Sequence, residues 1–437
     1  GKLTFKGGVH PYDGKELSKN SPIEKYLPKG EMVYPLSQHI GAPSVPCVKK
    51  GDHVLAGQKI ADAGGFVSVP LHASVSGTVK GIERRLTATG TMAESIIIEN
   101  DQQYEETEFY SADPESLSAS EILDRIREGG VVGMGGAGFP THVKLAPKDP
   151  AAIEYVLVNG AEGEPYLTSD YRRMLEEPEK VVAGLEIILR LFDRAKGYIC
   201  IEDNKPDCIA KMKELVKDRP RIEVKELMTK YPQGGERTLI YAVTGRQINS
   251  TMLPADVGCI VDNVDTVTAI YHAVALGRPV ISRIITVTGD DVVSPKNFTV
   301  LTGTCMQELI QAAGGLKTEA AKIVSGGPMM GFALYDLNVP CVKTTSAFLC
   351  MEHDPVSEAT VTACINCGRC VKVCPGRVLP SRLATLAERG DMEGFEKMNG
   401  MECCECGCCS YVCPAKRPLT QSIKSMRKMV LASRRKK

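Results

Sequence analysis

One cysteine-rich stretch decides the fold of the last part of the chain, and it occurs twice. It reads Cys364-Ile365-Asn366-Cys367-Gly368-Arg369-Cys370-Val371-Lys372-Val373-Cys374-Pro375, and the spacing returns in Cys403-Cys404-Glu405-Cys406-Gly407-Cys408-Cys409-Ser410-Tyr411-Val412-Cys413-Pro414. Four thiolates spaced in this way bind a cubane iron–sulfur cluster, and the proline ends the binding loop. Zinc, the main alternative, prefers two separated Cys-x-x-Cys pairs. The repeat therefore predicts two [4Fe–4S] clusters in a ferredoxin-like domain that transfers single electrons.

The two runs are expected to exchange one ligand each. In the two-cluster ferredoxin pattern, the fourth cysteine of each run binds the other cluster. The first cluster is therefore assigned to Cys364, Cys367, Cys370 and Cys413, and the second to Cys403, Cys406, Cys409 and Cys374. Cys404 and Cys408 break the spacing, and we interpret them as non-ligands that could still exchange with a ligand.

Composition limits the remaining functional classes. The chain has 437 residues, enough for about three domains. Lys and Arg together number 53, as do Asp and Glu, so nothing indicates a nucleic-acid partner. Reduced thiols and labile clusters favour the cytosol. No signal peptide is recognised, and the most apolar run, residues 181–192, is too short to span a bilayer. We expect a protein that is soluble or peripheral to a membrane.

Residues 1–100 contain short strand patterns separated by tight turns, for example at Gly51-Asp52 and Gly57-Gln58. The pattern resembles the flattened barrel of biotinyl and lipoyl domains. Those carriers need a lysine at a hairpin tip, and the corresponding stretch, residues 62–67, has none. The expectation is a docking or structural barrel rather than a swinging-arm carrier.

A glycine-rich loop follows a predicted helix over residues 119–128 that Ser118 caps. The loop reads Val131-Val132-Gly133-Met134-Gly135-Gly136-Ala137-Gly138-Phe139-Pro140-Thr141-His142-Val143-Lys144. Dense glycines let backbone N–H groups face a phosphate or a flat ring with no side chain in the way, and Lys144 could neutralise phosphate charge. The loop departs from the dinucleotide fingerprint because Pro140 stands where a helix should begin. A simple tight turn is the alternative.

Residues 151–245 alternate between strand and helix patterns. Strands are expected over 153–158, 197–201 and 221–226, and helices over 179–192, 207–216 and 237–243. The alternation predicts a parallel sheet covered on both faces, with a ligand beyond the carboxyl ends of the strands. The loop of residues 159–165 leaves one such end, and its carboxylates suit ribose hydroxyls or a flavin edge. Solvated loop acids are the alternative.

The sequence changes character over residues 284–350. Strands over 284–289 and 298–301, with a helix capped by Thr304, predict a small α+β module. After the cysteine runs, residues 424–437 are rich in Lys and Arg. Such a tail is usually solvated, and contact with anionic lipid or an acidic partner is the alternative.

Together these motifs resemble the RnfC family of the Rnf (Rsx) electron-transport complexes over essentially the whole chain, and the centre is similar to the flavoprotein subunit of respiratory complex I. The most specific run is Gly135 to Thr141. The resemblance implies a multi-domain α/β and α+β chain: a lipoyl-like barrel-sandwich (1–100), a Rossmann-like parallel α/β domain for FMN and NADH (117–280), a β-grasp-like SLBB module (281–352), and the two-cluster ferredoxin-like domain with its basic tail (353–437).

The resemblance also implies a cofactor site. Its residues would be Gly133, Gly135, Gly136, Gly138, Phe139, Lys144, Asn159, Glu162, Glu164, Tyr231, Gly234, Glu236, Asn263 and Thr266. Met134, Ala161 and Gly235 stand where complex I has an arginine, an acid and a glutamate, so this chain departs from that pattern mainly in its NADH contacts.

The function implied by the resemblance is that of a peripheral electron-transfer protein on the cytoplasmic side of the cell membrane. Its partners would be separate membrane subunits of the Rnf complex and a ferredoxin-type cluster subunit, and the complex would couple ferredoxin:NAD⁺ electron transfer to movement of Na⁺ or H⁺. NADH would give hydride to FMN, which joins two-electron to one-electron chemistry because flavin is stable in three redox states. A non-catalytic iron–sulfur relay without flavin is the alternative.

Overall fold

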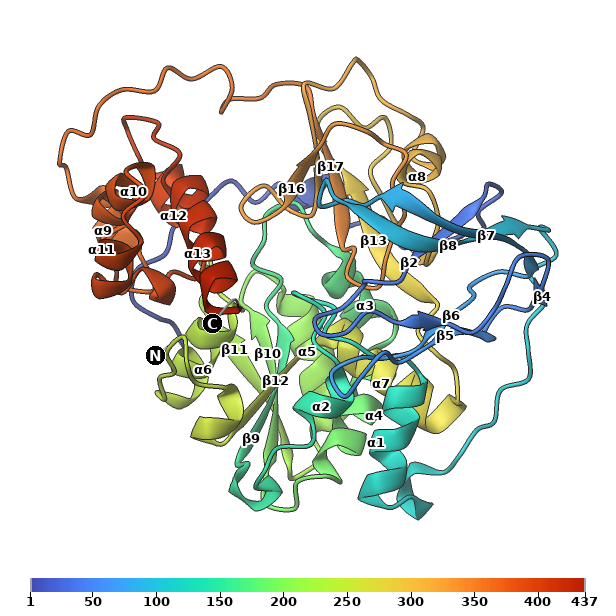
Figure 1. Cartoon of the computed structure of the whole chain (residues 1–437). Helices are drawn as coiled ribbons and strands as arrows, with labels where there is room; N and C mark the ends of the chain where they lie inside the picture. The colour runs from blue at the N-terminus through green and yellow to red at the C-terminus, as the bar shows by residue number, and fades with distance from the viewer. Residues whose placement is uncertain (1, 436–437) are drawn as a thin grey trace.

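The computed structural model describes residues 2–435, and its first compact unit is a two-sheet barrel. One sheet has the order β2 (Met32–Pro35), β8 (Met92–Asn100), β7 (Gly77–Leu86), β4 (His53–Val54), and the other β3 (Val45–Pro46), β5 (Lys59–Asp62), β6 (Leu71–His72). Side chains from both sheets, among them Ile60, Leu71 and Ile96, share one fully buried core. The expected barrel-sandwich is confirmed (Figure 1).

The central unit is a four-stranded parallel sheet with helices on both faces (Figure 1). Its order is β11 (Ile222–Leu227), β10 (Lys196–Glu202), β9 (Tyr155–Gly160), β12 (Cys259–Asn263). Helices α1 (Ala119–Glu128), α4 (Pro178–Leu189), α5 (Pro206–Val216) and α7 (Val264–Leu276) contribute to one core, and α6 (Glu236–Thr244) packs on the other. Along β9, Val156 and Val158 face the first core and Leu157 the second, so burial on both faces explains the apolar run.

The ends of these helices follow local signals in some cases and not in others. Ser118 and Glu121 form a reciprocal capping box at the start of α1, as its predicted start requires. The short helices α2 (Thr141–Lys144) and α3 (Ser169–Glu176) were not predicted.

The third unit is a six-stranded mixed sheet with one helix, α8 (Met306–Ala312). Its order is β1 (Ile23–Tyr26), β14 (Lys296–Leu301), β13 (Ser282–Thr288), β17 (Ala347–Met351), β15 (Lys322–Ser325), β16 (Phe332–Leu334). The predicted cap of α8 is wrong: Cys305 occupies the N-cap position, and the Thr304 hydroxyl donates to the Leu301 carbonyl.

The C-terminal unit is helical, and an extended segment after β17 leads to it (Figure 1). It comprises α9 (Arg369–Val373), α10 (Pro380–Glu388), α11 (Met392–Lys397), α12 (Cys408–Tyr411) and α13 (Leu419–Arg435) around a small apolar core. In the basic tail, Arg427 pairs with Glu405 and Arg434 with Glu396; Lys436 and Lys437 lie outside the described residues. No described helix is long and apolar enough to cross a bilayer.

The N-terminal segment before β1 runs along the other units rather than within the barrel. Leu3 bridges to Leu227 beside the parallel sheet, and the Gly8 N–H donates to the Val373 carbonyl of the helical unit over 2.7 Å. The Lys15 ammonium donates to backbone carbonyls of residues 162, 164 and 167. Strand β1 then pairs with β14 in the mixed sheet. The first 26 residues therefore tie three units together.

Candidate functional site

The glycine-rich loop lies at the point where the strand order of the parallel sheet reverses. The chain passes from β9 to β10 and β11 on one side, and β12 is added on the other side of β9. Asn159 and Asn263, at the ends of β9 and β12, are register partners. A Cβ added at Gly135 would lie 3.0 Å from the Asn263 Cβ, so the loop packs directly on this edge. Ligands of open α/β sheets bind in such a crevice.

The loop is anchored at its base and exposed at its tip. The Met134 N–H donates to the Thr266 hydroxyl (2.9 Å), and the Arg283 guanidinium donates to the Met134 carbonyl (3.0 Å). At the tip, a Cβ added at Gly136 would have no heavy atom within 4 Å. Gly138 has a φ of +76°, which favours glycine. The result is a fixed loop with bare backbone at its exposed end, which suits a flat ring.

Lys144 has a protein partner in this crevice. Its ammonium donates to the Val261 carbonyl (2.8 Å) and lies 3.3 Å from Oδ1 of Asp262, whose side chain is fully buried. The other carboxylate oxygen of Asp262 has no partner among the described residues. Burial raises the pKa of Asp262 and that of the neighbouring Glu236. An unpaired buried oxygen at the crevice is a place for a ligand donor, and sequence reasoning missed Asp262 although it ends β12 just before Asn263.

Tyr231 and Gly234 lie on a loop between the crevice and the second cysteine run. The Asn159 side-chain amide donates to the Gly234 carbonyl (2.7 Å). Tyr231 is 4% exposed, and its hydroxyl donates to the Cys406 carbonyl (2.7 Å). This loop therefore connects the end of β9 to the cysteine-rich unit.

The two predicted carboxylates of the loop after β9 are both occupied by protein donors. Glu162 accepts from the N–H groups of Asp170 (2.6 Å) and Tyr171 (3.2 Å) in the first turn of α3. Glu164 accepts from the N–H of Met329 (2.6 Å), in the mixed-sheet unit, and burial raises its pKa to about 7. Glu162 stabilises a helix start, and Glu164 joins two units.

The first set of predicted cluster ligands lines one cavity. Cys364, Cys367 and Cys370 of the first run share a cavity of about 220 Å³ with Cys413 of the second. Gly368, at a φ of +71°, turns the chain into α9 and so places Cys370. Four thiols from both runs around one hollow fit a cubane cluster with an exchanged ligand.

The second set of cysteines is packed in the core of the helical unit. Cys409 is buried there, with Cys374 and Cys403 against it, and the Glu405 N–H donates to the Cys403 sulfur (3.3 Å). No three potential metal ligands converge among residues 2–435, and burial raises the pKa of Cys403 to about 12. Binding of iron must therefore draw the thiols together and release protons.

The two extra cysteines differ from the ligand set in their surroundings or position. Cys408 is fully buried in a separate small cluster with Val9 and Tyr231, which supports its interpretation as a non-ligand. Burial and a hydrogen bond to the neighbouring Cys406 raise the pKa of Cys404.

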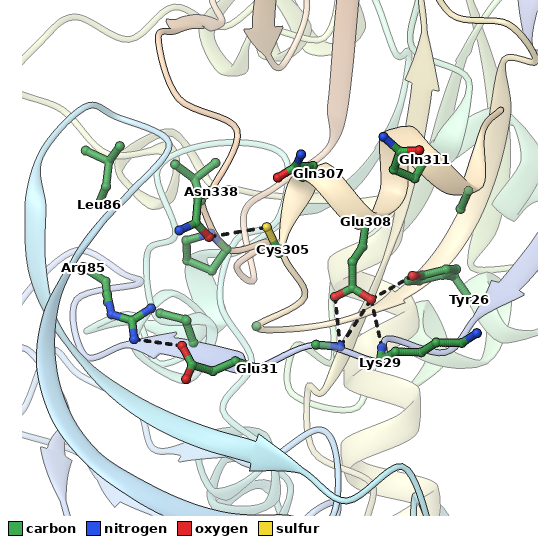
Figure 2. A pocket seen from close by; sticks show the side chains of 16 residues that line it. Tyr26, Lys29, Glu31, Arg85, Leu86, Cys305, Gln307, Glu308, Gln311 and Asn338 are labelled. Carbon is green, nitrogen blue, oxygen red and sulfur yellow. Dashed lines mark hydrogen bonds and ion pairs between the residues drawn. The ribbon is translucent and has the colours of Figure 1, made fainter. Parts of the chain in front are cut away.

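A larger cavity of about 660 Å³ lies between the barrel and the mixed sheet (Figure 2). The Glu308 carboxylate accepts from the Tyr26 hydroxyl (2.9 Å) and the Lys29 N–H (2.8 Å), and Arg85 pairs with Glu31. Its charged groups thus satisfy one another, and neither the glycine loop nor a cysteine run lines it. Size alone does not make it the redox site.

Comparisons with known families follow the same division of the chain. The RnfC barrel sandwich hybrid domain matches residues 3–103, the Nuo51 FMN-binding domain residues 126–272, and the SLBB domain residues 284–333.

Curated relatives match over nearly the whole length. The RnfC-type subunit of the Na(+)-translocating ferredoxin:NAD(+) oxidoreductase complex of Acetobacterium woodii is 43% identical over 99% of this chain and 98% of its own length. Its counterpart in the proton-translocating complex of Clostridium ljungdahlii is 45% identical over 97% and 93%. The counterpart in the ion-translocating oxidoreductase complex of Rhodobacter capsulatus is 37% identical over 96% and 82%. The chain therefore belongs to the RnfC family of ion-translocating ferredoxin:NAD⁺ oxidoreductase complexes.

Proposed function

We propose that this chain exchanges hydride between NADH and FMN and passes single electrons between FMN and two [4Fe–4S] clusters. The observation that carries the proposal is the direct contact between the two redox parts. Tyr231, on the loop that leaves the flavin crevice, donates to the Cys406 carbonyl inside the second cysteine run over 2.7 Å. A scaffold around an isolated relay would not need this contact.

The flavin would lie on the exposed tip of the glycine loop. Gly135 and Gly136 offer bare backbone, and Asn159 and Asn263 offer amide groups from the two strand ends. When bound, flavin accepts hydride as one electron pair and returns the two electrons singly. Asp262 offers an acceptor oxygen to a ligand N–H or O–H at the base of the crevice. NADH would approach the open side of the same crevice.

The two clusters would act in a fixed order. The second run packs on the flavin domain, where Arg237 also pairs with Glu402 over 3.0 Å. In the first run, Cys364 and Cys367 are exposed, and Ile365 beside them is 67% exposed. Electrons would enter through the second cluster and leave through the first, toward a ferredoxin-type cluster subunit.

The remaining assignments come from the family. The relatives are named as subunits of ion-translocating complexes, so we assign this chain to the cytoplasmic side of the cell membrane, bound to separate membrane subunits of its complex. Its charge balance leaves no role for nucleic acid.

The test separates the flavin from the clusters. In a Cys367→Ser, Cys406→Ser double variant, NADH should still bleach the flavin anaerobically and a small flavin-reactive dye should still be reduced. Reduction of any acceptor beyond the clusters should be lost. Stopped-flow absorbance follows both steps. A double variant that folds and holds FMN but is not bleached by NADH would refute flavin as the entry point. Absence of flavin fluorescence after acid release from the wild-type chain would favour the relay.

A further inference from the structure

One loop of the mixed-sheet unit contacts both redox parts. It comprises residues 326–331, with the sequence Gly-Gly-Pro-Met-Met-Gly, and joins β15 to β16. In Figure 1 this hairpin points toward the C-terminal helices, and the Lys424 ammonium of α13 lies 4.7 Å from the Phe332 ring centroid. Neither the flavin assignment nor the cluster assignment gives this loop a role.

On the flavin side, the loop is in tight contact with the acidic segment after β9. One oxygen of Glu164 accepts from the Met329 N–H (2.6 Å) and the Met330 N–H (3.3 Å). Gly327 is buried, and a Cβ added to it would lie 1.9 Å from the Glu164 Cγ, so no larger residue fits there. The loop and the segment therefore have a fixed separation.

On the cluster side, Met329 reaches the second cysteine run. Its carbonyl oxygen lies 2.8 Å from the place of a Cβ at Gly407, which is the turn just after Cys406. Its side chain packs on the cluster of Val9, Tyr231 and Cys408. An unbranched, polarisable side chain suits such an irregular junction.

We propose that residues 326–331 are a positioning element that fixes the distance between the flavin crevice and the second cluster, and that the Met329 side chain is its main contact. The inference rests on the function proposed above. An extended segment joins the mixed sheet to the cysteine runs, so the covalent connection does not fix that distance, and contacts such as Met329 must do so. One-electron transfer depends steeply on separation, and the loop would act on that step while leaving hydride transfer unchanged.

Two neighbouring methionines give a matched pair of variants. Met329 is half-buried at the junction, whereas the Met330 side chain is 48% exposed. A misplacement of about 1 Å costs up to about a hundredfold in rate; we therefore expect Met329→Ala to slow cluster reduction by NADH about tenfold. Flavin bleaching, FMN content and iron content should match the wild type. Met330→Ala should change none of them, and Met329→Leu should restore most of the rate.

A second readout needs no cofactor. In apo-protein, Met329→Ala should increase amide hydrogen exchange over residues 403–410 and leave residues 364–374 unchanged, while Met330→Ala behaves like the wild type. Gly327→Ala, which separates the loop from Glu164, should add faster exchange over residues 160–167. Equal exchange and equal cluster reduction in the Met329 and Met330 variants would overturn the proposal. If the wild-type chain held no flavin, the proposed function would fail, and the apo exchange result would still decide whether the loop fixes the junction.

Discussion

The tip of the glycine loop allows a ligand effect to be separated from a folding effect. At Gly136 the φ angle lies outside the left-handed region, and an added Cβ meets no heavy atom within 4 Å. Gly136→Val should therefore not strain the apo-protein, and the loss of glycine flexibility in the unfolded chain should stabilise it by about 0.4–1 kcal/mol. If the flavin ring uses this space, the valine overpacks it at a cost of about 1–3 kcal/mol. That cost corresponds to FMN binding weaker by about 5-fold to 150-fold.

The neighbouring glycine provides the control. A Cβ at Gly135 would meet Asn263 at 3.0 Å, so Gly135→Ala should strain the apo-protein itself. The assay is FMN titration of apo-protein by fluorescence quenching, with the thermal midpoint of each apo variant measured in parallel. Wild-type FMN affinity in Gly136→Val would show that the loop is only a turn. A lower apo midpoint in Gly136→Val, like that of Gly135→Ala, would show that the space is not open.

Three further predictions test the clusters, the junction and the buried charge. Cys413→Ser should remove the cluster held by the first run although it lies in the second, and Cys404→Ser should keep both clusters, as iron counts and EPR spectra of each variant would show. Tyr231→Phe leaves the Cys406 carbonyl without its donor, a loss of about 1–3 kcal/mol that should lower the thermal midpoint. Burial lowers the pKa of Lys343 to about 7, so the unfolded chain takes up this proton more readily, and the free energy of unfolding should rise between about pH 7 and pH 10. Lys343→Met should remove that rise, measured as the thermal midpoint against pH.

The parallel sheet could be predicted because its signals are local. The predicted strand over residues 153–158 became β9 at Tyr155–Gly160, since pairing with β10 and β12 sets the ends. Helix α3 escaped prediction because part of its start is stabilised by Glu162, which lies outside the helix. Strand β1 pairs with β14, and the register partner of Ile23 is Asn297, so no local pattern could place it.

The candidate site divides in the same way. Bare glycines announce an exposed backbone from the sequence, and the structure leaves Gly136 open. The partner of a charged side chain is not a local property. Lys144 is paired with Asp262, which is 118 positions away, and Glu164 with an amide 165 positions away. Residue type identified these side chains as candidates, and only the fold shows which of them still have a free donor or acceptor.

The charge balance of the crevice bears on how the proposed flavin would be held. The Lys144 ammonium is already neutralised by Asp262, and the pKa of Glu236 is raised by burial, so these side chains offer no free cation for a phosphate. Positive potential is left to the backbone: the loop amides and the N-terminus of α7, which begins at Val264 beside the loop. Asp265 in the first turn of α7 would weaken that potential, but Arg173 and Arg283 pair with both of its oxygens. Arg283 also holds the Met134 carbonyl, so one buried arginine both neutralises the helix start and fixes the loop that faces it.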